Sequence, residues 1–140
     1  MKHKKISDML YILRLENGEE IIGSLLKFFT EHNIKSGSFT AIGAITKVEL
    51  RYFFQKKKQY HDKIIEKELE VVSLTGNINM MGSEPYLHAH IVCSDENMQC
   101  FGGHLKAAIV GPTIEVVVDA SDEIVGRKFS EEAGLNLLDI

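Results

Sequence analysis

The sequence reads Pro85-Tyr86-Leu87-His88-Ala89-His90-Ile91-Val92, turns through Ser94-Asp95-Glu96-Asn97, and continues as Phe101-Gly102-Gly103-His104-Leu105. A polar turn between two apolar runs is typical of a β-hairpin. Side chains alternate along a strand, so His88 and His90 share one face. Opposed residues of an antiparallel pair point the same way, so His104 joins that face whenever the loop has an odd number of residues. The stretch therefore predicts a hairpin with three histidines on one face.

Two registers of this hairpin are open. A loop centred on Glu96 places His88 opposite His104, and a loop centred on Asn97 places His90 there instead. An even-length loop would put His104 on the far side. Neutral imidazole binds zinc at about 2.0–2.1 Å, and three protein ligands leave one position for water or a ligand. The pattern predicts a site for zinc or another divalent transition metal at His88, His90 and His104; the alternative is three histidines that only pack or hydrogen-bond at a subunit interface.

The two cysteines flank the same turn. A hairpin centred on Glu96 puts Cys93 and Cys100 on opposite faces, which argues against a disulfide and suits a reducing cytoplasm. Cys100 shares the histidine face, but it lies four strand residues, roughly 13 Å, from His104 and is too distant to be a fourth ligand. No leader or apolar run of membrane length occurs, so we expect a cytoplasmic protein without a membrane partner.

Length and composition indicate one ordinary globular domain. The chain has 140 residues, of which 44% are hydrophobic and 26% charged, enough to bury a core. The net charge of −4 argues against a protein that coats nucleic acid through overall charge. Basic residues gather only in an N-terminal tip, residues 1–8, and at Lys56, Lys57 and Lys58. We expect residues 9–140 to form the domain.

Periodicity gives the remaining elements. Apolar residues at helical spacing predict one amphipathic helix from about Gly18 to His32. Runs rich in β-branched and aromatic residues predict strands at residues 9–15, 38–42, 48–53, 69–76 and 113–118. The small residues Gly43 and Ala44 between two of these runs suit a bulge or a close backbone approach. Residues 55–63 are expected at an exposed hairpin tip, and residues 121–140 mix a short helix with extended chain. The predicted class is α+β, with one long helix on a mostly antiparallel sheet.

Four segments together resemble the PPC domain family (plants and prokaryotes conserved), also described as a PD1-like DNA-binding domain. They are Ile42-Gly43-Ala44-Ile45 running into Val48-Glu49-Leu50-Arg51; Glu70-Val71-Val72-Ser73-Leu74-Thr75-Gly76-Asn77-Ile78; Pro85-Tyr86-Leu87-His88-Ala89-His90-Ile91; and residues 94–97 through Gly102-Gly103-His104-Leu105. The resemblance spans residue 10 to the C-terminus and implies a compact α+β homotrimer with a metal, zinc in particular, at His88, His90 and His104. The AT-hook of plant members is absent, and Lys67-Glu68-Leu69 replaces their glycine-arginine-phenylalanine, so the chain resembles a stand-alone prokaryotic member.

Three functions are compatible with these residues. The first is a metal-binding homotrimeric module with a regulatory, ligand-sensing or DNA-binding role. The second is a metal-dependent enzyme acting on a small molecule, for which a general base is needed; the candidates are Glu49, Glu84 and Asp95. The third is phosphate contact with DNA. Its candidate residues are Arg51, Lys56, Lys57 and Lys58, helped by Lys2, Lys4 and Lys5. The groups expected to orient the imidazoles are Asn77, Asn79 and Ser73.

Overall fold

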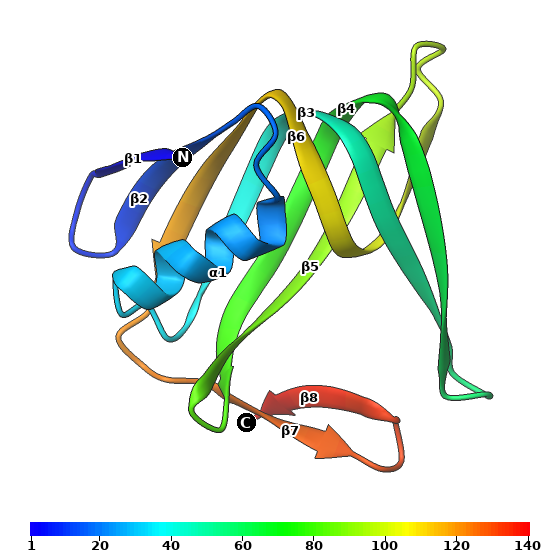
Figure 1. The fold of residues 1–140 in the computed structure, drawn as a ribbon. Helices are drawn as coiled ribbons and strands as arrows, with labels where there is room; N and C mark the ends of the chain where they lie inside the picture. Colours follow the sequence, from blue (N-terminus) through cyan, green and yellow to red (C-terminus); the bar gives the residue numbers. More distant parts are fainter.

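The computed structural model describes residues 1–140 and contains one helix and eight strands (Figure 1). The elements are β1 (Lys2–Lys5), β2 (Leu10–Glu16), α1 (Ile21–Glu31), β3 (Gly37–Phe54), β4 (Gln59–Met81), β5 (Glu84–Ser94), β6 (Cys100–Ala120), β7 (Gly126–Ser130) and β8 (Leu135–Asp139). The prediction of a mostly antiparallel α+β domain is confirmed. The helix is far too short and insufficiently apolar to cross a membrane.

All the strands belong to one strongly curled sheet. Its order is β1-β2-β6-β3-β4-β7-β8, and β5 pairs with both β4 and β6, which closes β3, β4, β5 and β6 into a ring. The strands β3, β4 and β6 are 18, 23 and 21 residues long. They are much longer than the other strands and extend along the whole length of the curled sheet. The turn of the β3–β4 hairpin projects towards the β7–β8 hairpin (Figure 1).

Two predicted strands, residues 38–42 and 48–53, are the two ends of the single strand β3. The pairing shifts register between Ala41 and Gly43 and again between Ile45 and Lys47, which marks β-bulges that bend the strand. Gly43 has φ +142°, and a Cβ there would stand 2.2 Å from the carbonyl oxygen of Thr113 on β6. The expected close approach at Gly43 is therefore present, but it bends a continuous strand instead of ending one.

The helix α1 covers one face of the sheet. Ile21, Leu25, Phe28 and Phe29 are completely buried on its sheet-facing side, as the apolar spacing predicted. The helix begins three residues later than expected, because the carboxylate of Glu20 accepts hydrogen bonds from the backbone N–H groups of Ile22 and Gly23 at 3.0 and 2.6 Å and caps the first turn. The face of α1 contributes to one cluster of 26 buried hydrophobic residues.

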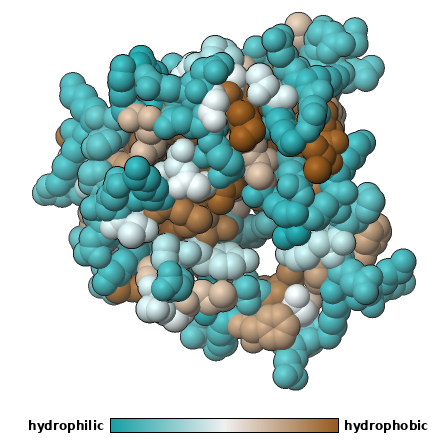
Figure 2. Space-filling model, viewed as in Figure 1, coloured by the Kyte–Doolittle hydropathy of each residue, from teal (hydrophilic) through white to brown (hydrophobic).

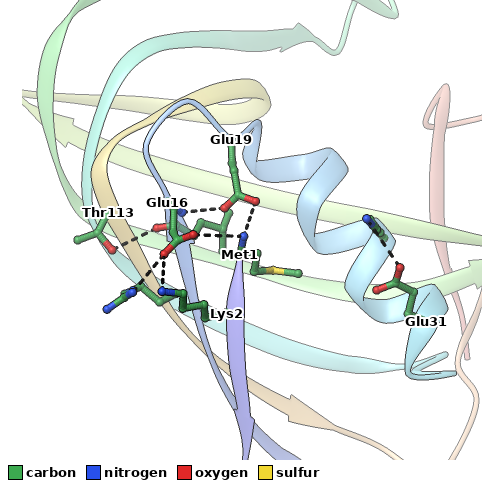
Figure 3. Close-up of polar contacts among 9 residues, drawn as sticks. Met1, Lys2, Glu16, Glu19, Glu31 and Thr113 are labelled. Carbon is green, nitrogen blue, oxygen red and sulfur yellow. Dashed lines mark hydrogen bonds and ion pairs between the residues drawn. The ribbon is translucent and has the colours of Figure 1, made fainter.

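The basic N-terminal tip forms a strand. Residues 2–5 pair with β2 as β1, and the N-terminal amino group and Lys2 meet Glu19 and Glu16 at the end of β2 and in the turn that follows (Figure 3). The amino group of Met1 lies 2.6 Å from Glu19, and Lys2 and Arg14 lie 3.3 and 3.2 Å from Glu16. These ion pairs hold the first residues of the chain against the domain.

The C-terminal residues form a hairpin, and the short helix expected among residues 121–140 is absent. Strands β7 and β8 pair with each other, and β7 joins the sheet through one parallel bridge between Gly126 and Met80. At the hairpin's other end, Lys58 Nζ donates to the carbonyl oxygen of Glu131 at 2.5 Å. The β3–β4 turn is limited to residues 55–58, because residues 59–63 already belong to β4. The hydrogen bond from Lys58 to Glu131 thus joins the β3–β4 hairpin to the β7–β8 hairpin.

Substitution of Gly76 tests the close packing inside the ring. Gly76 lies between Phe39 on β3 and Ala89 on β5, and a Cβ would stand 2.5 Å from both the His88 carbonyl oxygen and the Phe39 ring. We expect Gly76→Ala to lower the free energy of unfolding by about 1–3 kcal/mol in urea titrations, because overpacking forces neighbours to move. The control is Gly126→Ala, whose new methyl meets nothing closer than 3.8 Å. Equal stability of the two variants would contradict this account.

Candidate metal centre

The β5–β6 hairpin has the register centred on Asn97. His90 pairs with His104, and Ser94 pairs with Cys100, so the odd-length loop predicted from the sequence is the one that forms. The carboxylate of Asp95 fixes this loop by accepting from the backbone N–H groups of Asn97 and Gln99 at 3.0 and 3.1 Å. Between them, Met98 takes a left-handed conformation with φ +60°. The loop thus sets which face His104 occupies.

The three imidazoles lie together on that face. One ring nitrogen from each of His88, His90 and His104 lies within 4.8 Å of the other two. The Nε2 atoms of His88 and His90 are 3.3 Å apart, which matches the roughly 3.3 Å between neighbouring nitrogens around a tetrahedral zinc with 2.0–2.1 Å bonds. His88 and His104 are partly buried and His90 is exposed. The donor set fits a transition metal after a small movement of the third ring.

Two of the imidazoles are held in the neutral form that binds metal. Burial lowers the pKa of His104 to about 4, with further lowering by His88, His90 and Arg51. The pKa of His88 is also lowered, first by burial and then by the positive charge of Arg127. Because a metal competes with protons for the same lone pairs, both shifts favour ligation at neutral pH.

Arg127 of β7 is the polar neighbour of His88 on its Nδ1 side. Its Nη2 atom lies 3.5 Å from His88 Nδ1, and its guanidinium donates to the side-chain oxygens of Asn77 and Asn79 at 2.8 and 3.3 Å and to the carbonyl oxygen of Asn136 at 2.8 Å. The expectation that Asn77, Asn79 and Ser73 bond to the imidazoles is wrong. The two asparagines instead position the arginine, and Ser73 is exposed beside Val92.

A cavity of about 360 Å³ opens on His88 and His104. It lies between the β3–β4 hairpin and the β7–β8 hairpin (Figure 1), and the space-filling view of the same side is hollowed there (Figure 2). Its walls combine two cations, two tyrosines and apolar side chains. The residues around the two histidines are Arg51, Tyr60, Tyr86, Arg127, Phe129, Gly134, Leu135, Asn136 and Leu137.

Arg51 is already paired within the chain. It donates to the two carboxylate oxygens of Asp62 at 3.0 and 2.9 Å and lies over the ring of Tyr60 at 4.5 Å. Lys106 contacts the same Asp62 at 2.9 Å and Glu49 at 2.5 Å. Hydrogen bonds from Arg51, and then from Lys106, hold the pKa of Asp62 well below its usual range. The positive charges of Arg51 and Lys106 are therefore balanced by the negative charges of Asp62 and Glu49.

The predicted bases lie outside the cavity. Glu49 is held by Lys106, Asp95 is held by Lys67 and its own turn, and Glu84 is exposed at the start of β5. None of the three lines the cavity. The structure therefore does not bring any of the three predicted bases to the histidines.

The predicted phosphate-contact residues are divided. Arg51 faces the cavity, whereas Lys56 and Lys57 are exposed at the β3–β4 turn and Lys58 is bonded to Glu131.

Both cysteines are free thiols, Cys93 buried and Cys100 exposed. Burial raises the pKa of Cys93 to about 11.

Sequence reasoning missed Arg127, Tyr60, Tyr86 and Asn136 as neighbours of the histidines. Arg127 lies 39 residues from His88 in the chain, in a segment without a recognisable pattern. Tyr60 lies in the polar run, residues 55–63, for which the sequence predicts a hairpin tip. Folding back of the β3–β4 and β7–β8 hairpins brings Tyr60, Arg127 and Asn136 to the site, whereas Tyr86 lies on β5 two residues before His88, and strand alternation could have placed it there.

Comparison with known proteins places this geometry in a family. A model of the Plants and Prokaryotes Conserved (PCC) domain matches residues 3–122. A crystal structure of a candidate DNA-binding protein from Bacteroides thetaiotaomicron is 38% identical, with a TM-score of 0.95 over 99% of this chain and 96% of that one. A metal-containing protein from Archaeoglobus fulgidus is 32% identical, with a TM-score of 0.85 over 96% and 98% of the two chains.

One curated relative is much longer. The bifunctional protein GlmU of a Synechococcus strain is 27% identical over 116 residues, which are 81% of this chain and 17% of that protein. The match to the family model and the 38% identity over nearly the whole chain agree with the motifs around the histidine hairpin. The chain belongs to the Plants and Prokaryotes Conserved domain family.

Proposed function

We propose that this protein is a metal-binding module in which His88, His90 and His104 hold zinc or another divalent transition metal. The observation that carries the proposal is the convergence of three imidazole nitrogens within 4.8 Å on one sheet face. The name of the Archaeoglobus fulgidus relative, a metal-containing protein, supports it. Three nitrogen ligands suit zinc, copper, nickel or iron better than calcium or magnesium.

Different parts of the structure would hold the metal ligands and control access to the metal. The rigid β5–β6 pairing would hold the three rings in place, and the cavity would leave the remaining coordination position open to a ligand. A bound zinc supplies a Lewis acid, or a water of lowered pKa, at that position. Tyr60 and Tyr86 border the cavity and would restrict what reaches the metal.

Elemental analysis of the full-length protein tests the metal site. We expect about one transition metal ion per chain in wild-type protein prepared without chelator, and less than about a tenth of that in a His88→Ala, His104→Ala double variant, because one remaining imidazole binds weakly. The matched control is His61→Ala, an exposed histidine on β4, which should keep its metal. Wild-type protein that neither carries metal nor takes up added zinc would refute the site.

The lowered histidine pKa values predict how metal-free protein responds to acid. The pKa of His104 is about 4 in the folded protein and about 6.5 when unfolded. Protons therefore favour the unfolded chain between these values, and stability falls as the pH drops from about 6.5 towards 4. We expect His104→Asn to remove on the order of 1 kcal/mol of this loss, because partial exposure weakens the effect. Urea titrations of chelator-treated protein at pH 7.5 and 5 measure it; identical pH dependence in both proteins contradicts the assignment.

We also propose that the protein assembles as a homotrimer through the sheet face opposite α1. That face carries uncovered apolar side chains on four neighbouring strands. They are Ile12, Ile42, Val72 and Val117. Ile42 and Val72 are 59% and 51% exposed, and exposed apolar side chains gathered on neighbouring strands mark an interaction surface.

Light scattering after gel filtration tests the assembly. We expect wild-type protein at three times the chain mass of 15.8 kDa, and an Ile42→Glu, Val117→Glu variant at the monomer mass, because burying carboxylates in an apolar interface is unfavourable. Ile64→Glu is the control, since Ile64 is 56% exposed on the other half of β4. A monomeric wild-type protein would exclude the trimer.

A metal-dependent enzyme acting on a small molecule is the second candidate function, and the cavity beside His88 and His104 favours it. DNA contact at Arg51, Lys56, Lys57 and Lys58 stays a prediction. The description of the Bacteroides thetaiotaomicron relative supports it. The net charge of −4 and the internal pairing of Arg51 and Lys58 weigh against it.

A further inference from the structure

Arg127 carries a positive charge that no carboxylate neutralises. Of the three arginines in the chain, Arg14 pairs with Glu16 and Arg51 with Asp62. The three oxygens bonded to Arg127 are the neutral ones of Asn77, Asn79 and Asn136. A partly buried cation without a counter-charge is costly unless a ligand completes it.

The guanidinium is also held ready for a ligand. Three of its five N–H groups are used by these neutral oxygens, and its plane lies over the ring of Tyr86 with Cζ 5.0 Å from the centroid. One of the two remaining N–H groups lies near His88 Nδ1 at the hydrogen-bond limit of 3.5 Å. A fixed guanidinium loses little freedom on binding a carboxylate and offers it charge-assisted hydrogen bonds.

The rest of the cavity determines which charge, size and polarity a complementary ligand has. No acidic side chain lines the cavity, and its second arginine is neutralised by Asp62. Apart from the two histidines, Gly134 and Asn136, the remaining wall is apolar or aromatic: Tyr60, Tyr86, Phe129, Leu135 and Leu137. A volume of about 360 Å³ lies at the small end of the range for small-molecule sites. The complementary ligand is a small anion with an apolar body.

We propose that this cavity binds a small organic carboxylate with an aromatic or short aliphatic body, and that Arg127 receives the carboxylate. The apolar body lies against the β7–β8 hairpin, while the carboxylate end lies beside His88. The hairpin falls outside residues 3–122, the part matched by the family model, whereas the Bacteroides thetaiotaomicron structure matches 99% of this chain. Binding to Arg127 does not require metal; only contact between ligand and metal rests on the proposed metal site.

Titration calorimetry of the full chain tests the proposal with phenylpyruvate and phenylacetate as probes and phenylacetamide as their neutral analogue. We expect saturable binding of a carboxylate below about 10 mM and at least tenfold weaker binding of the amide. Arg127→Gln should weaken carboxylate binding about 10- to 100-fold, as expected for losing a charged hydrogen-bond partner. Arg14→Gln, at an exposed arginine on β2, should bind like the wild type.

A second variant guards against a folding defect in Arg127→Gln. Leu137→Trp, at a partly exposed position on the cavity wall, should block both carboxylates while leaving Arg127 in place. Equal binding of phenylacetamide, unchanged binding in Arg127→Gln, or no carboxylate binding to folded wild-type protein would each overturn the proposal. Carboxylate binding by a protein that takes up no metal would sustain this proposal and refute the metal site; metal uptake without carboxylate binding would do the reverse.

Discussion

The pairing of His90 with His104 across the β5–β6 hairpin is the constraint on which the candidate site depends. Side chains alternate along a strand, so a slip of one residue in this register would turn His104 to the opposite face. The register is set by a short loop whose geometry Asp95 fixes through two backbone hydrogen bonds and Met98 through its positive φ. A further ion pair of Asp95 with Lys67 of β4 ties the loop to the sheet. The groups that hold the three imidazoles together thus lie at the turn, away from the imidazoles themselves.

The second requirement is the curl of the sheet, which supplies the cavity wall. Bulges in β3 near Gly43 bend the long strands, and the absence of a side chain at Gly43 and Gly76 permits the close strand contacts that result. The bend carries the β3–β4 hairpin, with Arg51 and Tyr60, round to the histidines. Lys58 then fastens this hairpin to the β7–β8 hairpin through Glu131. A site that looks local in the sequence is therefore assembled from three hairpins of the chain: β3–β4, β5–β6 and β7–β8.

Much of this arrangement could be predicted because it follows from short-range periodicity. The spacing of Ile21, Leu25 and Phe28 determines the buried face of α1, and strand alternation places the histidines together. Periodicity does not reveal where a strand continues through a bulge, so it predicts two strands, residues 38–42 and 48–53, where the structure has the single strand β3. Nor does it place Arg127, because β7 is a five-residue strand joined to the sheet by one bridge, and tertiary contacts rather than its own pattern decide its position. The candidate ligands were therefore predictable from sequence, and the cation beside them was not.

The charge of Arg127 links the two proposals for the site. A divalent ion on the histidines and a guanidinium 3.5 Å from His88 repel each other, and this repulsion acts in a half-buried place where water screens it weakly. An N–H of Arg127 directed at Nδ1 also favours the proton on Nε2 of His88, the nitrogen that faces His90 and would bind the metal. A carboxylate on Arg127 relieves the repulsion, because it brings negative charge to the site. Linked binding is reciprocal, so a carboxylate that strengthens metal binding is itself bound more tightly when the metal is present. Because the charge of Arg127 is not neutralised within the chain, binding of metal at the histidines and binding of an anion at Arg127 strengthen each other. This coupling is a physical basis for a module that senses a ligand.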